Sequence, residues 1–242
     1  SLVGSEMCIR DRFCDDSAKD IVNMLLSECQ KANVEIKTQT EILGIKQHQG
    51  MFYIQTNKGE YECESLVIAT GGLSMPKLGA SPFGYKVAEQ FGHTIEETRA
   101  GLVPFTLHEK DKSVLGELSG ISLPASVSCK NTNFNENILF THRGISGPAI
   151  LQISSYWHSG DAIKINLGVE KSFTEVLEQE RINSPNAQLS TVLAHHFPKR
   201  FVQEVLPYFN IENKPLKQLQ SHQIEQIADA FESWQLKPNG TE

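Results

Sequence analysis

The first stretch of patterned sequence has the period of a helix. Between residues 17 and 33 the apolar side chains recur at helical spacing, so one face is apolar. They are Val22, Leu25, Leu26, Cys29 and Ala32. Asp16 and Ser17 offer an N-cap, and Asp20 follows Ser17 by three residues as in a weak capping box. The pattern therefore predicts an amphipathic helix that ends near Asn33.

Beyond Asn33 the period changes to two. Val34 and Ile36 alternate with polar neighbours, and residues 41–45 continue in the same extended fashion. Phe52 and Ile54 lie on one face of a further alternating stretch, residues 51–56. Asn57-Lys58-Gly59 is a turn, and residues 61–63 begin the returning strand. These features predict a meander of short antiparallel strands.

A continuous apolar run, Leu66-Val67-Ile68-Ala69, follows the meander and ends in Thr70-Gly71-Gly72. An unbroken run of this kind is typical of a strand buried on both faces of a parallel sheet. Ligands bind beyond the carboxyl ends of such strands, and glycine lets a flat or anionic ligand approach the backbone closely. A strand followed by a tight turn explains the same residues without any ligand, so both interpretations stay open.

The pattern of hydrophobic and turn-forming residues changes after Gly79. Residues 85–91 predict a helix closed by Gly92. Short strand-like pieces, separated by Gly, Ser, Asn and Asp, then indicate a small β-barrel or sandwich. They are residues 100–107, 123–129, 138–141 and 162–168. After Lys171 four stretches carry helical spacing, namely residues 173–181, 189–196, 199–206 and 223–234.

Composition and charge narrow the class of protein. Of the 242 residues, 39% are hydrophobic and 21% are charged, which is typical of a soluble globular protein. The net charge of −7 argues against a nucleic-acid partner, since such proteins usually carry a basic excess. No apolar run reaches the ~18 residues of a membrane span, so no membrane partner is expected.

The cysteines and histidines predict no metal site. The five cysteines are scattered without a C-x-x-C pair, which indicates reduced thiols in a cytoplasmic protein. His195 and His196 are adjacent and would point about 100° apart on a helix. No cysteine or carboxylate lies at ligand spacing from them.

Two segments together resemble one family far more specifically than either does alone. They are Ala69-Thr70-Gly71-Gly72 and Leu139-Phe140-Thr141-His142-Arg143-Gly144-Ile145-Ser146-Gly147-Pro148-Ala149-Ile150-Leu151. With the stretches around Phe83-Gly84-Tyr85 and Phe91-Gly92-His93, they resemble the YhiN/BaiN-like flavoproteins, known as NAD(P)/FAD-dependent oxidoreductases or aminoacetone-oxidase-like enzymes.

The resemblance implies an α/β fold with three parts. Residues 13–99 would form a partial FAD-binding, Rossmann-like domain of the two-dinucleotide-binding flavoprotein type. Residues 100–170 would form an inserted β-barrel, and residues 171–242 a helical subdomain. Residues 1–12 look like a non-native tract and are set aside.

The same resemblance implies the cofactor and its contacts. Glu41 and Ile42 would approach the adenine of FAD. Residues at the end of the apolar run, Ala69, Thr70, Gly71 and Gly72, would approach the flavin. NAD(P)H would be the electron donor, and the substrate a small unsaturated or carbonyl-containing molecule. Neither the substrate's identity nor the oligomeric state follows from a likeness of fold.

The Thr141–Gly147 loop is the other chemical candidate. His142 can titrate near neutrality, and Arg143 can hold an anionic group such as a cofactor phosphate. These two side chains are therefore the candidates for catalysis. The alternative is that the two glycines of the loop form a barrel corner and that the polar side chains satisfy loop carbonyls.

The chain also departs from the family pattern. It contains no G-x-G-x-x-G, the turn that grips a pyrophosphate at a helix N-terminus. It also ends at Glu242, before the glycine-rich segment with which the family returns to the flavin. We therefore expect a polypeptide truncated at both ends. Two alternatives follow: a non-catalytic chain that does not retain FAD, or a binding module built on the β insert.

Overall fold

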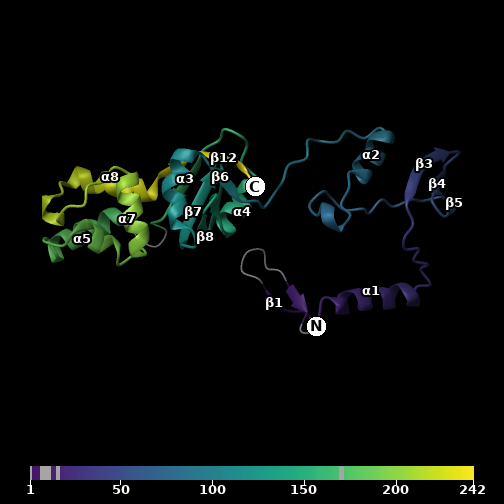
Figure 1. Cartoon of the computed structure of the whole chain (residues 1–242), viewed down its shortest axis with the longest axis horizontal. Coiled ribbons are helices and arrows are strands. Elements are labelled where there is room, and N and C mark those ends of the chain that lie inside the picture. Colours follow the sequence, from purple (N-terminus) through teal and green to yellow (C-terminus); the bar gives the residue numbers. More distant parts are fainter. Residues whose placement is uncertain (1, 6–11, 15–16, 169–171) are drawn as a thin grey trace. The chain divides into compact units, whose positions relative to one another are not determined.

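A computed structural model describes residues 2–5, 12–14, 17–168 and 172–242 of the chain (Figure 1). The described residues form two compact units. The first unit comprises residues 2–5 and 12–99, and the second comprises residues 100–242. The assignment of residues 1–12 as a non-native tract stays a prediction.

The first unit holds two small sheets and two helices. Its elements are β1 (Leu2–Ser5), β2 (Arg12–Cys14), α1 (Lys19–Lys31), β3 (Ile42–His48), β4 (Met51–Thr56), β5 (Gly59–Cys63), a 3-10 turn η1 (Pro76–Leu78) and α2 (Phe83–Gln90). Strands β1 and β2 pair antiparallel. Strands β3, β4 and β5 form the predicted antiparallel meander, with Ile54 opposite Ile45 on one side and Tyr61 on the other. The two predicted helices are also present.

The core of this unit is small. Ile45, Ile54 and Val87 are its buried residues, so α2 packs on one face of the meander. Helix α1 has no buried residue, although its apolar face is as predicted. Val22 and Leu25 on that face are 54% and 55% exposed. An apolar helix face stabilises a fold only when it is covered, and the described residues of this unit do not cover this one.

Two strand predictions in the first unit are wrong. Residues 66–69 are extended but form no strand, and Val67 is 84% exposed rather than buried on both faces. Among the described residues no strand pairs beside this run, so its backbone groups lack the ladder that would define a strand. Val34 and Ile36 likewise form no strand and are 54% and 51% exposed.

The second unit combines a sheet with a group of helices. Its strands are β6 (Phe105–Leu107), β7 (Ser122–Cys129), β8 (Thr132–Thr141), β9 (Gly144–Ser146), β10 (Ile163–Asn166), β11 (Trp234–Leu236) and β12 (Pro238–Thr241). Its helices are α3 (Glu109–Leu115), η2 (Gly116–Leu118), α4 (Pro148–Ser154), α5 (Phe173–Asn183), α6 (Leu189–Leu193), α7 (Lys199–Tyr208), η3 (Leu216–Gln218) and α8 (Ser221–Glu232).

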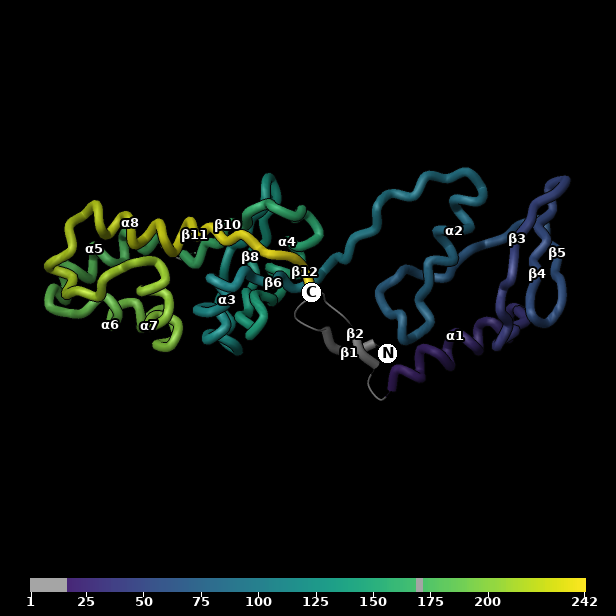
Figure 2. Tube along the Cα trace, turned by 45° about the horizontal axis from the view of Figure 1, so that its top comes forward, coloured from purple at the N-terminus to yellow at the C-terminus, as the bar shows by residue number. Residues whose placement is uncertain are grey.

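Seven strands form one antiparallel sheet in the order β11-β10-β7-β8-β9-β6-β12. Helices α5 to α8 lie in sequence between β10 and β11, which pair directly through Ile163 and Leu236. Strand β12 then pairs with β6 at the other edge. Figure 2 shows this last segment, in yellow, running from α8 back along the sheet. The helical group is therefore inserted between two neighbouring strands of the sheet.

The sheet and the helices of the second unit share one core. Phe140 on β8 lies with its ring centroid 5.8 Å from Phe201 of α7 and 6.2 Å from Trp234 of β11. Phe105, Phe140, Phe201 and Phe231 are all almost fully buried. Burial of large aromatic side chains at this density is the main source of stability for such a unit.

Candidate functional site

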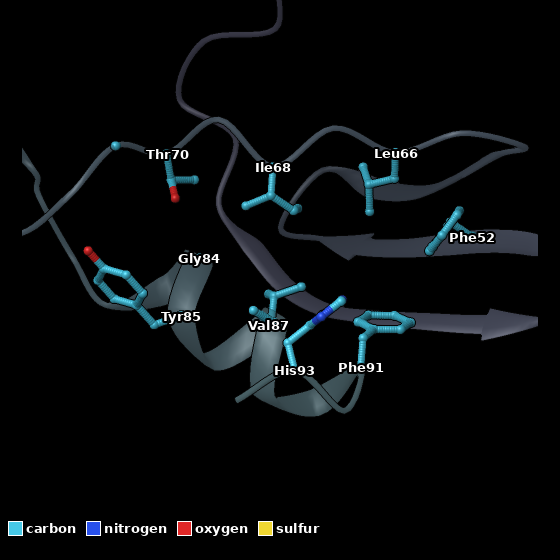
Figure 3. Close-up of a pocket in the computed structure, with 11 residues that line it drawn as sticks. Phe52, Leu66, Ile68, Thr70, Gly84, Tyr85, Val87, Phe91 and His93 are labelled. Atoms are coloured by element: carbon cyan, nitrogen blue, oxygen red, sulfur yellow. The ribbon is translucent and has the colours of Figure 1, made fainter. Parts of the chain in front are cut away.

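A pocket of about 520 Å³ lies in the first unit, between residues 66–71 and helix α2. Figure 3 shows Leu66, Ile68 and Thr70 pointing from the extended segment toward Val87 and Phe91. Phe52 of the meander closes one end of the pocket, which falls in the size range of small-molecule sites. The glycine turn and helix α2 therefore both line the pocket.

Glycines allow close packing between helix α2 and the turn at residues 70–72. Gly71 has a φ of +71°, a conformation that favours glycine. A Cβ at Gly84, in the first turn of α2, would lie 2.9 Å from the Thr70 hydroxyl oxygen. A Cβ at Gly72 would lie 3.7 Å from the Tyr85 hydroxyl oxygen. The close approach of α2 to the turn thus depends on a glycine in α2 itself.

The chemistry of the lining is mostly apolar and uncharged. It presents the hydroxyls of Thr70 and Tyr85 and the imidazole of His93, and it contains no lysine, arginine or carboxylate. Such a lining fits a flat, largely apolar ring with a few polar atoms, as in a flavin. It offers no cation to a pyrophosphate, so only the ring portion of FAD fits these residues.

Only some of the residues expected to contact the cofactor lie together. Thr70 and Gly71 line the pocket, whereas Ala69 and Gly72 are its chain neighbours and do not. Glu41 precedes β3, and its amide donates to Asn57 Oδ1 at 2.9 Å while its carbonyl accepts from the Asn57 amide at 3.1 Å. Ile42 is 38% exposed and pairs with Thr56. The contact of Glu41 and Ile42 with adenine stays a prediction.

The Thr141–Gly147 segment forms a tight corner of the second unit. Gly144 lies so close to β6 that a Cβ would overlap the Phe105 carbonyl oxygen. A Cβ at Gly147, whose φ is +94°, would lie 2.7 Å from the Asn137 carbonyl oxygen. Thr141 Oγ1 accepts the Gly144 amide hydrogen at 3.1 Å. Packing therefore accounts for the two glycines and the threonine of this segment.

His142 and Arg143 are both exposed at this corner. Arg143 forms an ion pair with Glu242. Neither side chain lines a pocket among those found in the described residues. Their catalytic role stays a prediction.

The search for metal and membrane features covers the same described residues. Within them, no three His, Cys, Asp or Glu side chains gather closely enough to hold a metal ion. Within them, too, no helix is long and apolar enough to cross a membrane.

Two family models match the chain, and their matched ranges overlap at residues 99–152. The family model described as the HI0933-like protein Rossmann domain matches residues 9–152, and the one described as the HI0933-like protein barrel and H2TH domain matches residues 99–242. The architecture is thus a Rossmann-like domain joined to a barrel with a helical part. The chain belongs to the HI0933-like family, which is the YhiN/BaiN-like flavoprotein family that the ATGG and FTHRGISGPAIL segments indicated.

Three proteins to which the chain is similar have named activities. The chain is 47% identical over 98% of its length to the ribosomal RNA dihydrouridine synthase of Escherichia coli K12, and 41% identical over 95% to that of Haemophilus influenzae. It is 23% identical over 89% of its length to the 3-dehydro-bile acid delta(4,6)-reductase of Clostridium scindens. The chain spans 60%, 58% and 56% of these three proteins.

Sequence reasoning gave no role to the residues on the far side of the pocket. The alternating pattern places Phe52 only on the apolar face of a strand. Gly84, Tyr85 and His93 lie in stretches that carried the family resemblance, yet helical spacing alone does not reveal which turn α2 packs against. A glycine in the first turn of a helix is the signal that could have indicated a close approach.

Proposed function

We propose that the full-length protein of which this chain is part is a flavin-dependent reductase of a carbon–carbon double bond conjugated to a carbonyl group, and that its substrate is a uracil base in ribosomal RNA. The observation that carries this proposal is the 47% identity to a ribosomal RNA dihydrouridine synthase over nearly the whole chain. The second such enzyme, at 41% identity, supports it.

The reaction balances as a two-electron reduction. A hydride adds to C6 of the uracil ring, a proton adds to C5, and the double bond between them is lost. A bound reduced flavin would supply the hydride, and NAD(P)H would be the reductant that restores the reduced flavin. We take the flavin to be FAD, since Rossmann-like domains bind dinucleotides.

The residues of the first unit that would hold the ring of the flavin are those of the pocket. Gly71 lets the ring approach the backbone, and Thr70 and Tyr85 offer hydroxyls for its polar edge. The apolar side chains Leu66, Ile68 and Phe52 exclude water from one side.

This proposal differs from the sequence-based expectation of a small-molecule substrate without nucleic acid. That expectation remains the second candidate, because the bile acid reductase is a relative whose substrate is small. Both candidates rest on the same chemistry, since each product forms by reduction of a double bond conjugated to a carbonyl. The higher identity and coverage of the RNA enzymes favour the first.

Flavin retention by the full-length protein tests the site. Gly71→Ala changes a residue that lines the pocket, whereas Gly79→Ala changes one that does not. The two glycines are matched, with φ of +71° and +92° and no atom within 4 Å of an added Cβ. We expect Gly71→Ala to lose most of the bound flavin, measured by absorbance per mole of protein, and Gly79→Ala to keep it. Equal flavin content in both variants would contradict the assignment of the turn to the flavin site.

Substrate class is tested separately. The full-length protein with NAD(P)H is incubated with ribosomal RNA lacking dihydrouridine, or with a 3-dehydro-delta(4,6) bile acid. We expect the RNA to gain the mass of two hydrogen atoms at a uridine. Reduction of the bile acid without any change in the RNA would select the second candidate.

A further inference from the structure

A second hollow lies entirely within the helical part of the second unit. It has a volume of about 430 Å³ and is formed by residues 209–214 and helix α8. Phe209, Ile211 and Ile227 give it apolar walls. Figure 1 shows α7, which leads into residues 209–214, beside α8 in this part of the unit.

The aromatic wall of this hollow is held in place. The Phe209 ring meets Phe231 edge to face at 5.5 Å and Trp234 at 5.3 Å between centroids. Phe231 and Trp234 are themselves buried in the core of the unit. Edge-to-face packing of this kind orients a ring as well as burying it. Phe209 is therefore a fixed, half-buried surface rather than a loose side chain.

The rim of the hollow carries three amides. Gln223 and Gln226 come from α8, and Asn210 comes from the loop, where its φ is +57°. The Gln223 Oε1 accepts the Gln220 amide hydrogen in the capping box of α8. Among the described residues the side chains of Asn210 and Gln226 have no hydrogen-bond partner. An amide can donate and accept at once, which is what the edge of a nucleobase requires.

The charged residues of the lining oppose each other. Glu212 and Lys214 are the two charged side chains in it, and Lys214 Nζ lies 2.7 Å from Glu212 Oε2. The hollow therefore carries no net charge, which disfavours a phosphate or a metal ion and favours a neutral ring. An aromatic wall with hydrogen-bonding side chains around it is how proteins recognise unpaired bases in RNA.

We infer that this hollow binds an unpaired base of the RNA substrate. The inference rests on the proposed function, and it adds the part of the second unit that recognises the RNA. The net charge of −7 repels the phosphate backbone, so the hollow would hold the RNA through the base, and contacts to a base release no counterions. Binding through the hollow should thus depend less on salt than binding through phosphate contacts.

Photo-crosslinking with the full-length protein tests the inference. The probe is a short single-stranded RNA in which one uridine is replaced by 4-thiouridine, and crosslinked peptides are identified by mass spectrometry. We expect crosslinks within residues 209–230. Crosslinks confined to other parts of the protein, or their complete absence, would overturn the inference.

A matched pair of variants sharpens the test. Gln226→Ala removes a rim amide, and Gln203→Ala removes an exposed amide of α7 that does not line the hollow. We expect Gln226→Ala to weaken binding of the same RNA about 3- to 10-fold, the worth of one hydrogen bond, and Gln203→Ala to leave it unchanged. Equal affinities of the two variants would contradict the inference.

Formation of dihydrouridine is measured in parallel so that the two failures stay distinct. Dihydrouridine formation without crosslinks in the hollow would leave the proposed function and overturn the inference. Crosslinks in the hollow without dihydrouridine would leave the inference and remove the proposed reaction.

Discussion

Gly147 offers a direct test of why the corner at Thr141–Gly147 has its sequence. Its φ of +94° and ψ of +165° fall in a region that is essentially restricted to glycine. In Gly147→Ala the new Cβ would lie 2.7 Å from both the Asn137 carbonyl oxygen and the Leu139 amide nitrogen. Backbone strain and overpacking each cost roughly 1–3 kcal/mol, so the substitution should destabilise the unit by about 2–6 kcal/mol.

Gly160→Ala is the matched control. Its φ of +92° is nearly the same, but an added Cβ meets no atom within 4 Å. The control should therefore show only the backbone cost, about 1–2 kcal/mol. A larger loss in Gly147→Ala than in the control reports on the close approach of the corner to strand β8 together with the ψ of +165° at Gly147.

Urea unfolding followed by tryptophan fluorescence measures both variants. Trp157 and Trp234, both buried, lie in the second unit, so the signal reports on that unit. Equal losses of unfolding free energy in the two variants would refute the packing explanation. The Thr141–Gly147 segment would then need another reason for its glycines, such as contact with a cofactor.

Three further predictions concern single contacts. Burial raises the pKa of Tyr208, and the Tyr208 hydroxyl donates a hydrogen bond to Asp111 Oδ1 at 2.8 Å. The folded state therefore keeps this proton more tightly than the unfolded state does. The contribution of Tyr208 to the free energy of unfolding should be complete below about pH 10 and should fall above it, by up to about 1.4 kcal/mol per pH unit. Tyr208→Phe should lose that part of the alkaline slope in urea titrations, and an unchanged slope would contradict the assignment. In the first unit, Gly84→Ala should destabilise by about 1–3 kcal/mol, because the new Cβ would lie 2.9 Å from Thr70 Oγ1. Thr70→Ala in the same chain should recover part of this loss in a double-mutant cycle, whereas strictly additive effects would show that the two residues do not touch. Phe201→Ala should cost the second unit about 3–5 kcal/mol, since its fully buried ring packs on Phe140 and Phe197, and a loss under 1 kcal/mol in the same urea assay would argue against this core.

The meander and the barrel strands could be predicted from the sequence because their periods are local. Residues 51–56 alternate cleanly, and β4 spans those residues. β7 and β10 lie where the strand-like pieces were expected. The run at residues 66–69 failed because its apolar pattern shows only what a strand prefers, not whether a neighbour pairs with it. In the described structure none does.

The sequence does not predict strands that form only by pairing with strands far away in the chain. Strands β11 and β12 are three and four residues long, too short for a period to show, and they exist because β10 and β6 pair with them. The expected helix of residues 223–234 therefore ends at Glu232, and Trp234 begins β11. Helices α3 and α4, each of seven residues, also lie outside the stretches predicted as helical.

The sequence alone indicates only some of the residues of the candidate site. Thr70 and Gly71 stood out because glycine follows an apolar run. Tyr85 and His93 join them only through the packing of α2, which brings Gly84 against Thr70. Pocket residues from separate segments meet by tertiary contact, and a linear pattern does not encode that contact.

The most direct test of the proposed function is mass spectrometry of ribosomal RNA from cells. The host lacks its own ribosomal RNA dihydrouridine synthase and carries either the full-length gene of this protein or its Gly71→Ala variant. The proposal predicts that a uridine gains the mass of two hydrogen atoms with the unaltered gene and not with the variant. Ribosomal RNA that stays unreduced while the unaltered protein is present and holds flavin would contradict it.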